Sequence, residues 1–232
     1  MNGIVAALAA EARALGPSMP RAGPNAFSEF SQLHDGTLLA VSGIGGPAAG
    51  AAACALVEAQ VSSLMSFGLA GALDPALAAG TIMLPGELIS RDGARFVTCK
   101  TWREQVAASL GSGSAVSMGT LLTSARAIET PSEKAAAFRE SGAAAVDMES
   151  AAVAEVAAAH RLPFIAVRVI VDTAGDALPP TVIAASTAGR VQIGRLIAGL
   201  VAAPREIAAL IRLARRYRMA MRSLRLVGTH LA

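Results

Sequence analysis

Short apolar runs alternate with segments of helical composition along most of the chain, and this alternation limits the fold more than any other feature. The strand-like runs lie at residues 3–7, 37–41, 63–69, 80–84, 87–90, 95–98, 114–124, 143–147 and 163–172. The predicted helices lie at residues 48–60, 101–110, 132–141, 149–160 and 181–200. Strands that alternate with helices form a buried sheet with helices packed on it. The sequence therefore predicts an α/β fold with a mixed central sheet flanked by helices.

The chain is interpreted as one domain with a charged extension. Its 232 residues can bury about 70% of the surface of the unfolded chain around one core. Residues 205–232 contain seven basic residues and one acidic residue, a net charge of +6, so residues 1–204 carry −3 of the total of +3. Because the positive charge is confined to the end, we divide the chain into a domain at 1–203 and a basic C-terminal helix at 204–232.

Composition excludes several classes of protein. The chain is 53% apolar and 16% charged, so it is not intrinsically disordered. Only 3% of its residues are aromatic. Because few aromatic side chains are present on which bases could stack, we expect no nucleic-acid partner. Two distant cysteines, expected to be buried, and three histidines form no metal-binding motif. No apolar stretch reaches the ~18 residues of a membrane span and the N-terminus lacks a basic leader, which favours the cytoplasm.

Glycines and small polar residues follow several predicted strands. Ligands of such sheets bind at the carboxyl ends of the strands. The segment SGIGG at 42–46 follows one strand and opens a helix, and Gly71 lies in a glycine-rich segment after another. Glycine permits close approach of the backbone to a ligand, and a helix N-terminus attracts anions. Ser42, Gly43 and Gly71 are therefore candidate substrate-binding residues, although a tight strand-to-helix turn produces the same pattern.

Three carboxylates and one arginine lie where a charge is costly unless it is used or paired. Asp172 ends the apolar strand at 163–172 and Arg168 lies four residues earlier, so both side chains are expected on one face of the sheet. The alternative to a functional role is a structural ion pair between them. Glu149 opens a predicted helix, where the helix dipole by itself favours an acid. Glu11 follows the first strand, and the alternative to a functional role is a glutamate on a solvated helix face.

Five blocks of the chain resemble a known family in their order and spacing. They are GIVAALAAE near the start, SGIGGPAA, GLAGAL, AVDMESAAVA and PFIAVRVIVDTA. Together they resemble the purine nucleoside phosphorylase and nucleosidase superfamily over roughly residues 2 to 200, and most closely its methylthioadenosine/S-adenosylhomocysteine nucleosidase branch. The DMES segment, the PFIAVRVIVDTAGDALP block and the basic extension are similar to the hopanoid-associated phosphorylases.

The resemblance implies an enzyme that cleaves the N-glycosidic bond of an adenine nucleoside, most specifically adenosylhopane in hopanoid biosynthesis. It further implies a homodimer that uses no cofactor, with phosphate as a co-substrate only if the reaction is phosphorolytic. The alternatives for function are a soluble methylthioadenosine/S-adenosylhomocysteine nucleosidase, a purine nucleoside phosphorylase and a catalytically silent protein that binds nucleosides at a membrane surface.

The resemblance also implies a role for each candidate residue. Asp172 matches the general acid that protonates N7 of the departing purine. Glu149 matches the carboxylate that holds the ribose hydroxyls, and Met148 would pack beneath the sugar. Glu11 matches the base that activates the attacking water in the hydrolytic branch, and Arg168 matches an arginine that lines the water and ribose side. Asp172 must then hold a proton near neutral pH, although a free aspartate has a pKa of about 3.9. Burial favours this, and an ionised Arg168 nearby opposes it.

Two positions depart from the family's pattern. Ile128 matches the position at which the backbone meets the base edge, but Ala127 replaces the aromatic residue that commonly stacks on the base. Leu69 replaces a serine that helps to place the water in hydrolytic members. Phosphorolytic relatives bind phosphate with arginine and serine, whereas a carboxylate such as Glu11 at ~4 Å from phosphate costs roughly 4 kcal/mol per charge. Water is therefore predicted as the nucleophile, with phosphate as the alternative if Arg13 or a partner subunit offsets this charge.

The extension predicts an amphipathic helix over 204–226 that begins at Pro204. Its expected apolar face contains Ile207, Leu210, Leu213, Ala214, Tyr217, Met221 and Leu224. Its expected basic face contains Arg205, Arg212, Arg215, Arg216 and Arg222, with Arg218 and Arg225 at the border. Such a helix binds an anionic membrane surface, which suits a lipid-linked nucleoside and a peripheral location on the inner face of the cytoplasmic membrane. The alternatives are a helix docked on the domain with a solvated basic face, and nucleic-acid binding.

Overall fold

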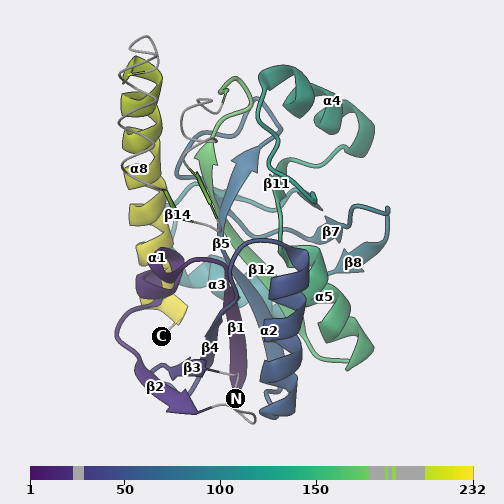
Figure 1. Ribbon diagram of the computed structural model, residues 1–232, viewed down its shortest axis with the longest axis vertical. Helices are drawn as coiled ribbons and strands as arrows, with labels where there is room; N and C mark the ends of the chain where they lie inside the picture. Colours follow the sequence, from purple (N-terminus) through teal and green to yellow (C-terminus); the bar gives the residue numbers. More distant parts are fainter. Residues whose placement is uncertain (23–28, 178–185, 188–189, 192–206, 232) are drawn as a thin grey trace.

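A mixed β-sheet forms the centre of the protein, and helices cover both of its faces (Figure 1). The computed structural model describes residues 1–22, 29–177, 186–187, 190–191 and 207–231. In spatial order the sheet contains β2 (Met19–Ala22), β3 (Glu29–Gln32), β4 (Leu38–Val41), β1 (Asn2–Ala6), β5 (Ser63–Ala72), β11 (Ala145–Asp147), β10 (Leu121–Thr123), β7 (Glu87–Ile89) and β8 (Arg95–Val97). β12 (Phe164–Asp172) also pairs with β5, and its other neighbour is β6 (Ile82–Met83). β6 in turn pairs with β9 (Val116–Ser117). The predicted α/β fold is confirmed.

The central strands β4, β1, β5 and β12 run parallel to one another, whereas β11 runs antiparallel to β5. Their sequences are almost continuously apolar because helices cover both faces of the sheet, which is typical of buried parallel strands. Parallel pairing brings the carboxyl ends of β1 and β12 to the same edge. That edge is where the sequence predicts the ligand.

Two hydrophobic cores lie between the sheet and the helices that cover its faces. One core packs α2 (Gly46–Glu58) and α5 (Ser150–Ala159) against one face, with alanines of both helices fully or almost fully buried. The other packs α1 (Ala9–Ala12), the short 3-10 helix η1 (Arg13–Leu15), α3 (Lys100–Ser109) and α8 (Ile207–Leu231) against the opposite face. A smaller cluster lies beneath α4 (Pro131–Ser141). The small alanine side chains let α2 and α5 pack closely over the sheet.

Four details differ from the sequence predictions. The antiparallel strands β2 and β3 were not predicted, and the run at 114–124 is divided into β9 and β10. A helix was predicted at 181–200, but 186–187 and 190–191 form the short antiparallel strands β13 (Ser186–Thr187) and β14 (Arg190–Val191), so the prediction is wrong there. The rest of that segment lies outside the described residues. Neither cysteine is fully buried as expected: Cys54 is exposed on the outward side of α2, and Cys99 is partly buried.

The buried contacts that the structure describes between α8 and the domain lie in the C-terminal half of the helix. Ala220, Met221, Leu224 and Val227 are buried against β12 and η1, whereas Tyr217 is exposed although it was expected on the apolar face. In Figure 1 the helix lies alongside the sheet. No helix in the described part of the chain is long and apolar enough to cross a membrane. The predicted boundary between residues 203 and 204 lies outside the described residues.

Replacing Gly228 by valine is expected to displace α8. A Cβ atom at this position would lie 2.8 Å from the carbonyl carbon of Ala14, so backbone meets backbone and neither side yields easily. We expect the free energy of unfolding in urea to fall by about 2 kcal/mol or more. Gly113→Val is the control, because open space surrounds Gly113. Equal stability of the two variants would contradict this docking.

Candidate active site

A cavity of about 200 Å³ opens where β1, β11 and β12 end. It lies at the sheet edge at which ligands bind in α/β proteins. Its lining residues are Ala7, Leu8, Glu11, Ile44, Leu69, Ala70, Gly71, Arg126, Ala127, Ile128, Val146, Asp147, Met148, Glu149, Val171 and Asp172. These residues are far apart in the sequence, so the fold assembles the cavity from separate segments.

Most of the residues predicted from the sequence meet in this cavity. Those that line it are Asp172, Glu11, Glu149, Met148, Ile128 and Gly71. Ser42, Gly43 and Arg168 do not line it. The Ser42 hydroxyl donates to the carbonyl of its neighbour Gly43 at 2.7 Å, as in a tight strand-to-helix turn.

Glu11 is a buried carboxylate held by two backbone donors. Its Oε2 accepts a hydrogen bond from the N–H of Leu8 at 2.9 Å, which fixes the start of α1. Its Oε1 accepts from the N–H of Leu69 on β5 at 2.9 Å. Burial raises the pKa of Glu11 above its ordinary value, although Arg168 and the backbone donors act in the opposite direction. The alternative of a solvated helix-face glutamate is therefore excluded, and the geometry suits a base.

Glu149 lies across the cavity and is also held by backbone donors. The N–H of Gly45 donates to its Oε1 at 2.8 Å, and the N–H of Met148 donates to its Oε2 at 3.3 Å. Gly45 has a φ of 99°, a conformation that favours glycine, and it immediately precedes α2. Burial raises the pKa of Glu149. The glycine-rich turn thus contributes to the site by orienting a carboxylate.

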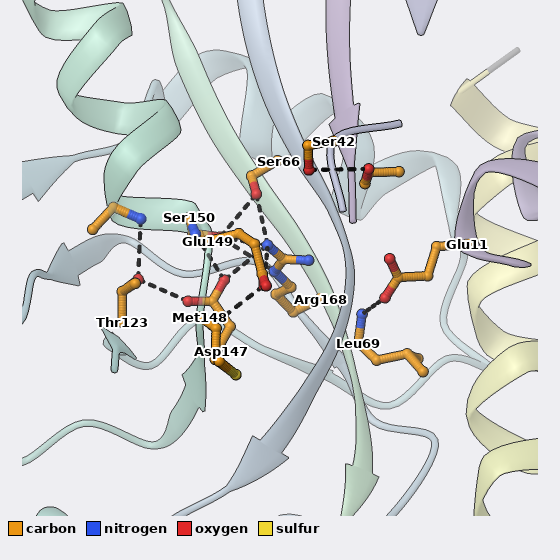
Figure 2. A network of polar contacts seen from close by, with 12 residues as sticks. Glu11, Ser42, Ser66, Leu69, Thr123, Asp147, Met148, Glu149, Ser150 and Arg168 are labelled. Carbon is orange, nitrogen blue, oxygen red and sulfur yellow. Dashed lines mark hydrogen bonds and ion pairs between the residues drawn. The ribbon is translucent and has the colours of Figure 1, made fainter. Parts of the chain in front are cut away.

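Arg168 is buried, does not line the cavity, and lies at the centre of the polar network that contains Asp147 and Glu149 (Figure 2). Its side chain is 1% exposed and its Nη2 lies 2.8 Å from Oδ2 of Asp147 and 3.9 Å from Oε2 of Glu149. The same nitrogen donates to the hydroxyls of Ser66 at 2.7 Å and Ser150 at 3.0 Å. Burial disfavours the charged guanidinium, but Asp147, Glu149 and Glu11 outweigh it and raise the pKa of Arg168.

Gly68 provides the space in which Arg168 approaches Glu11. A Cβ atom at Gly68 would lie 2.6 Å from Oε1 of Glu11 and would overlap Nη1 of Arg168. In Figure 2 one end of the guanidinium is turned toward Glu11. Any side chain at this position would therefore separate the two groups, which explains a glycine in the middle of β5.

Asp147 connects the network to the start of α5. Its Oδ1 accepts from the hydroxyl of Thr123 at 2.7 Å, and its Oδ2 accepts from the N–H of Ser150 at 3.0 Å. The Thr123 oxygen in turn accepts from the N–H of Ala151 at 3.0 Å. These contacts satisfy N–H groups of the first helical turn, so Asp147 both caps α5 and neutralises Arg168.

Asp172 is paired with Lys134, which rules out the alternative of a structural ion pair with Arg168 and corrects the expectation that the two side chains share a face of the sheet. Among the described residues no ion pair joins Asp172 to Arg168; Oδ2 of Asp172 pairs with Nζ of Lys134 on α4. The reason is a β-bulge near the end of β12, where Arg168 is opposite Gly68 but Asp172 is opposite Gly71. Gly68 and Gly71 are three positions apart on β5, so their partners face opposite sides of the sheet.

Burial raises the pKa of Asp172, whereas Lys134 and, more weakly, Arg216 lower it, and burial prevails. The lowering of the Asp172 pKa that was expected from Arg168 therefore comes from Lys134 and Arg216 instead. The net shift is upward, which is the direction that a general acid requires.

Sequence reasoning missed several residues of this site. Those residues are Ser66, Thr123, Arg126, Lys134, Asp147 and Ser150. Lys134 had one usable signal, because Thr130 and Glu133 form a capping box that marks the start of α4 and places Lys134 in its first turn. Asp147 stands in the AVDMES block but was not singled out.

Residues 3–202 match the Phosphorylase superfamily, which is most of the chain. The chain belongs to this superfamily. The predicted enzyme class, nucleosidase or nucleoside phosphorylase, is thereby confirmed for this Phosphorylase superfamily member. No curated protein sequence matches it. The finer resemblance to the hopanoid-associated members stays a prediction.

Solved structures support the same fold for this superfamily member. A methylthioadenosine/S-adenosylhomocysteine nucleosidase from Colwellia psychrerythraea, in complex with adenine, is 26% identical with a TM-score of 0.63, over 75% of this chain and 83% of that chain. The corresponding Neisseria meningitidis nucleosidase, in complex with methylthio-immucillin-A, is 18% identical with a TM-score of 0.73, over 99% and 97%. Futalosine hydrolase from Helicobacter pylori is 17% identical with a TM-score of 0.71, over 97% and 96%.

Replacing Arg168 by methionine is expected to destabilise this superfamily member strongly. The variant leaves Asp147 buried without its countercharge, so we expect a loss of about 3–5 kcal/mol in the free energy of unfolding, measured with urea. Arg95→Met breaks the exposed pair with Glu87 and is the control, with an expected change below about 1 kcal/mol. Equal losses in the two variants would show that the buried network does not contribute to stability as described.

Proposed function

We propose that this protein hydrolyses the N-glycosidic bond of an adenine nucleoside and releases adenine. One observation carries the proposal: three buried carboxylates, Glu11, Glu149 and Asp172, line one cavity, and burial raises the pKa of each. Cleavage of such a bond builds positive charge on the sugar and negative charge on the base, and this arrangement addresses both. The adenine bound to the Colwellia psychrerythraea nucleosidase supports the choice of base.

In the proposed reaction Asp172 donates a proton to N7 of the purine as the bond between nitrogen and sugar breaks. Glu149 accepts hydrogen bonds from the ribose hydroxyls and, with Glu11, stabilises the positive charge that develops on the sugar. Glu11 takes a proton from the attacking water, whose oxygen bonds to the sugar carbon. Adenine and the free sugar leave, and solvent returns the proton from Glu11 to Asp172.

The remaining lining residues are proposed to shape the substrate site. Met148 packs beneath the sugar, and the segment at Ile128 lies beside the base. Gly71 leaves room for the purine to approach Asp172, because a Cβ atom at Gly71 would lie 3.2 Å from Oδ1 of Asp172. Arg168, which does not line the cavity, acts by orienting Glu149 through Asp147, and so serves as a positioning residue.

The surroundings of Glu11 favour water over phosphate as the nucleophile. An ionised carboxylate at ~4 Å from phosphate would repel it by roughly 4 kcal/mol per charge. The nearest buried cation, Arg168, is already engaged with Asp147, Ser66 and Ser150. Phosphate remains a co-substrate only in the alternative phosphorolytic reaction, and the hydrolytic one uses no cofactor.

We propose adenosylhopane as the substrate, as the family resemblance implies. The cavity lining includes the apolar residues Ala7, Leu8, Leu69 and Val171, which can contact an apolar substituent on the ribose. Leu69 and Val171 also contact the core that contains α8, so these two residues and the basic helix lie on the same side of the sheet. The main alternative is a soluble methylthioadenosine/S-adenosylhomocysteine nucleosidase, which needs no membrane.

The exposed side of α8 fits an anionic membrane surface. It carries arginines and scattered apolar residues without any acidic residue: Ile211, Arg212, Arg215, Arg218, Met219, Arg222, Arg225 and Leu226. Arg218 and Arg225 thus lie within this face rather than at its border, whereas Arg216 turns toward the domain and pairs with Asp176. Each arginine near an anionic surface contributes about 1 kcal/mol. We propose that this face holds the enzyme on the inner face of the cytoplasmic membrane, as a homodimer.

Adenine release from adenosylhopane in detergent tests the reaction. We expect release with or without phosphate, and slower release from methylthioadenosine. The rate should fall at low pH, because Glu11 must be ionised, and at high pH, because Asp172 must be protonated; each raised pKa sets its limb above the ordinary value for that acid.

Asp172→Asn and Glu11→Gln should each lower kcat by about 100-fold or more. Glu104→Gln, on the exposed surface of α3, is the control. Strict dependence on phosphate would contradict hydrolysis, and equal or faster turnover of methylthioadenosine would contradict the lipid substrate.

Binding to phospholipid vesicles tests the exposed face of α8. The triple variant Arg215→Gln, Arg218→Gln and Arg222→Gln should bind vesicles that contain phosphatidylglycerol about 100-fold more weakly, because it loses about 3 kcal/mol of attraction. High salt should weaken the wild type likewise. A triple variant with the same loss of charge elsewhere, at Arg91, Lys100 and Arg139, should bind as the wild type does. Identical binding by the two variants would rule out a role for this face.

A further inference from the structure

Lys134 is a buried cation that the reaction scheme above does not use. Its side chain is 1% exposed, and its ammonium group pairs with Oδ2 of Asp172. It also donates to the carbonyl oxygens of Thr173 at 2.9 Å and Asp176 at 3.1 Å. Within the part of the chain that the structure describes, this ammonium group therefore contacts the end of β12 and the loop that follows it.

The contacts place Lys134 on the side of Asp172 away from the substrate. Lys134 does not line the cavity, whereas Asp172 does. Because Lys134 holds Oδ2, the other oxygen, Oδ1, is the one that a nucleobase would meet. A buried ammonium group is costly unless it is paired, so a lysine at this position needs a reason beyond filling space.

Two arginines lie near the pair of Lys134 and Asp172, but each pairs with a different carboxylate. Arg216 of α8 pairs with Asp176, and thus reaches the loop that Lys134 holds. Arg126 lines the cavity but pairs with Glu133 at the exposed start of α4.

Among the described residues, the remaining charged groups of the cavity lining belong to the network of Arg168. Glu11, Asp147 and Glu149 surround Arg168. Arg168 is separated from Asp172 by the β-bulge in β12. Among the described residues, Lys134 is therefore the cation that contacts the proposed acid directly.

We propose that Lys134 is the positioning residue of the general acid: it aims Oδ1 of Asp172 at the base and stabilises the carboxylate that forms when the proton leaves. The proposal rests on the proposed function. The proton passes from Oδ1 to the purine nitrogen as the bond to the sugar breaks, and Asp172 is left with a negative charge. The charge of Lys134 thus favours the transition state over the ground state, in which Asp172 is neutral.

Lys134→Gln separates this role from a structural one. Glutamine can still donate hydrogen bonds to the carbonyl oxygens of Thr173 and Asp176, but it carries no charge. We expect kcat for adenine release to fall by about 100-fold with KM changed less than about threefold. The high-pH limb of the rate profile should move upward by about one pH unit, because burial then raises the pKa of Asp172 without opposition from an ammonium group. Lys134→Arg, which keeps the charge, should restore the position of that limb.

A second substrate gives a readout that a loss of stability cannot imitate. 4-Nitrophenyl riboside has a leaving group that is stable as an anion and needs no protonation. Lys134→Gln and Asp172→Asn should therefore retain most of their activity toward it while losing adenine release. Thr130→Ala is the stability control, because it removes the cap of α4 at a cost of about 1 kcal/mol without contact to Asp172. It should leave both the pH profile and the ratio of the two activities unchanged.

The outcomes distinguish this inference from the proposed function. A wild type that releases no adenine from any nucleoside would overturn the function and the inference together. A wild type that releases adenine, with Lys134→Gln showing the same pH profile and the same ratio of activities, would overturn the role of Lys134 alone.

Discussion

The burial of Arg168 is the constraint on which the site depends. One guanidinium that is almost completely removed from solvent must be neutralised and hydrogen-bonded, and Asp147, Ser66 and Ser150 meet that demand. Asp147 also accepts a hydrogen bond from the N–H of Ser150, which fixes the start of α5 and therefore the position of Glu149. Gly68 lets the guanidinium reach toward Glu11 on the other side. The ribose side and the proposed water side of the cavity are thus coupled through one cation.

A second buried cation organises the base side independently. The β-bulge in β12 turns Asp172 away from Arg168 and toward α4, where Lys134 receives it. Because the two cations are separated, each carboxylate has its own electrostatic environment, which is how a fold assigns acid and base roles to similar groups. Arg216 and Asp176 connect the loop after β12 to α8, so the basic helix contacts the element that carries the proposed acid.

Much of the fold followed from the sequence, but the pairing of charges did not. The apolar runs predicted most of the described strands of the central sheet, and Glu11, Glu149 and Asp172 were singled out because charges at strand ends need a reason. The prediction that Arg168 and Asp172 share one face of the sheet was wrong because strict alternation was assumed and a bulge interrupts it. Lys134 was missed because a lysine in a helix rich in polar residues is indistinguishable from a solvated one until its neighbours are known. Arg216 was assigned to the basic face for the same reason.

The sequence by itself determined the class of fold, the edge of the sheet that holds the cavity and the residue types able to do the chemistry. These depend on hydrophobic periodicity and on local order along the chain, both of which are visible without coordinates. The tertiary structure decided which cation faces which carboxylate, which oxygen of Asp172 is left for a substrate and which part of α8 is buried. Those properties arise from contacts between residues far apart in the chain. A shift of one residue in strand register is enough to move a side chain to the other face of the sheet and so to change its partner.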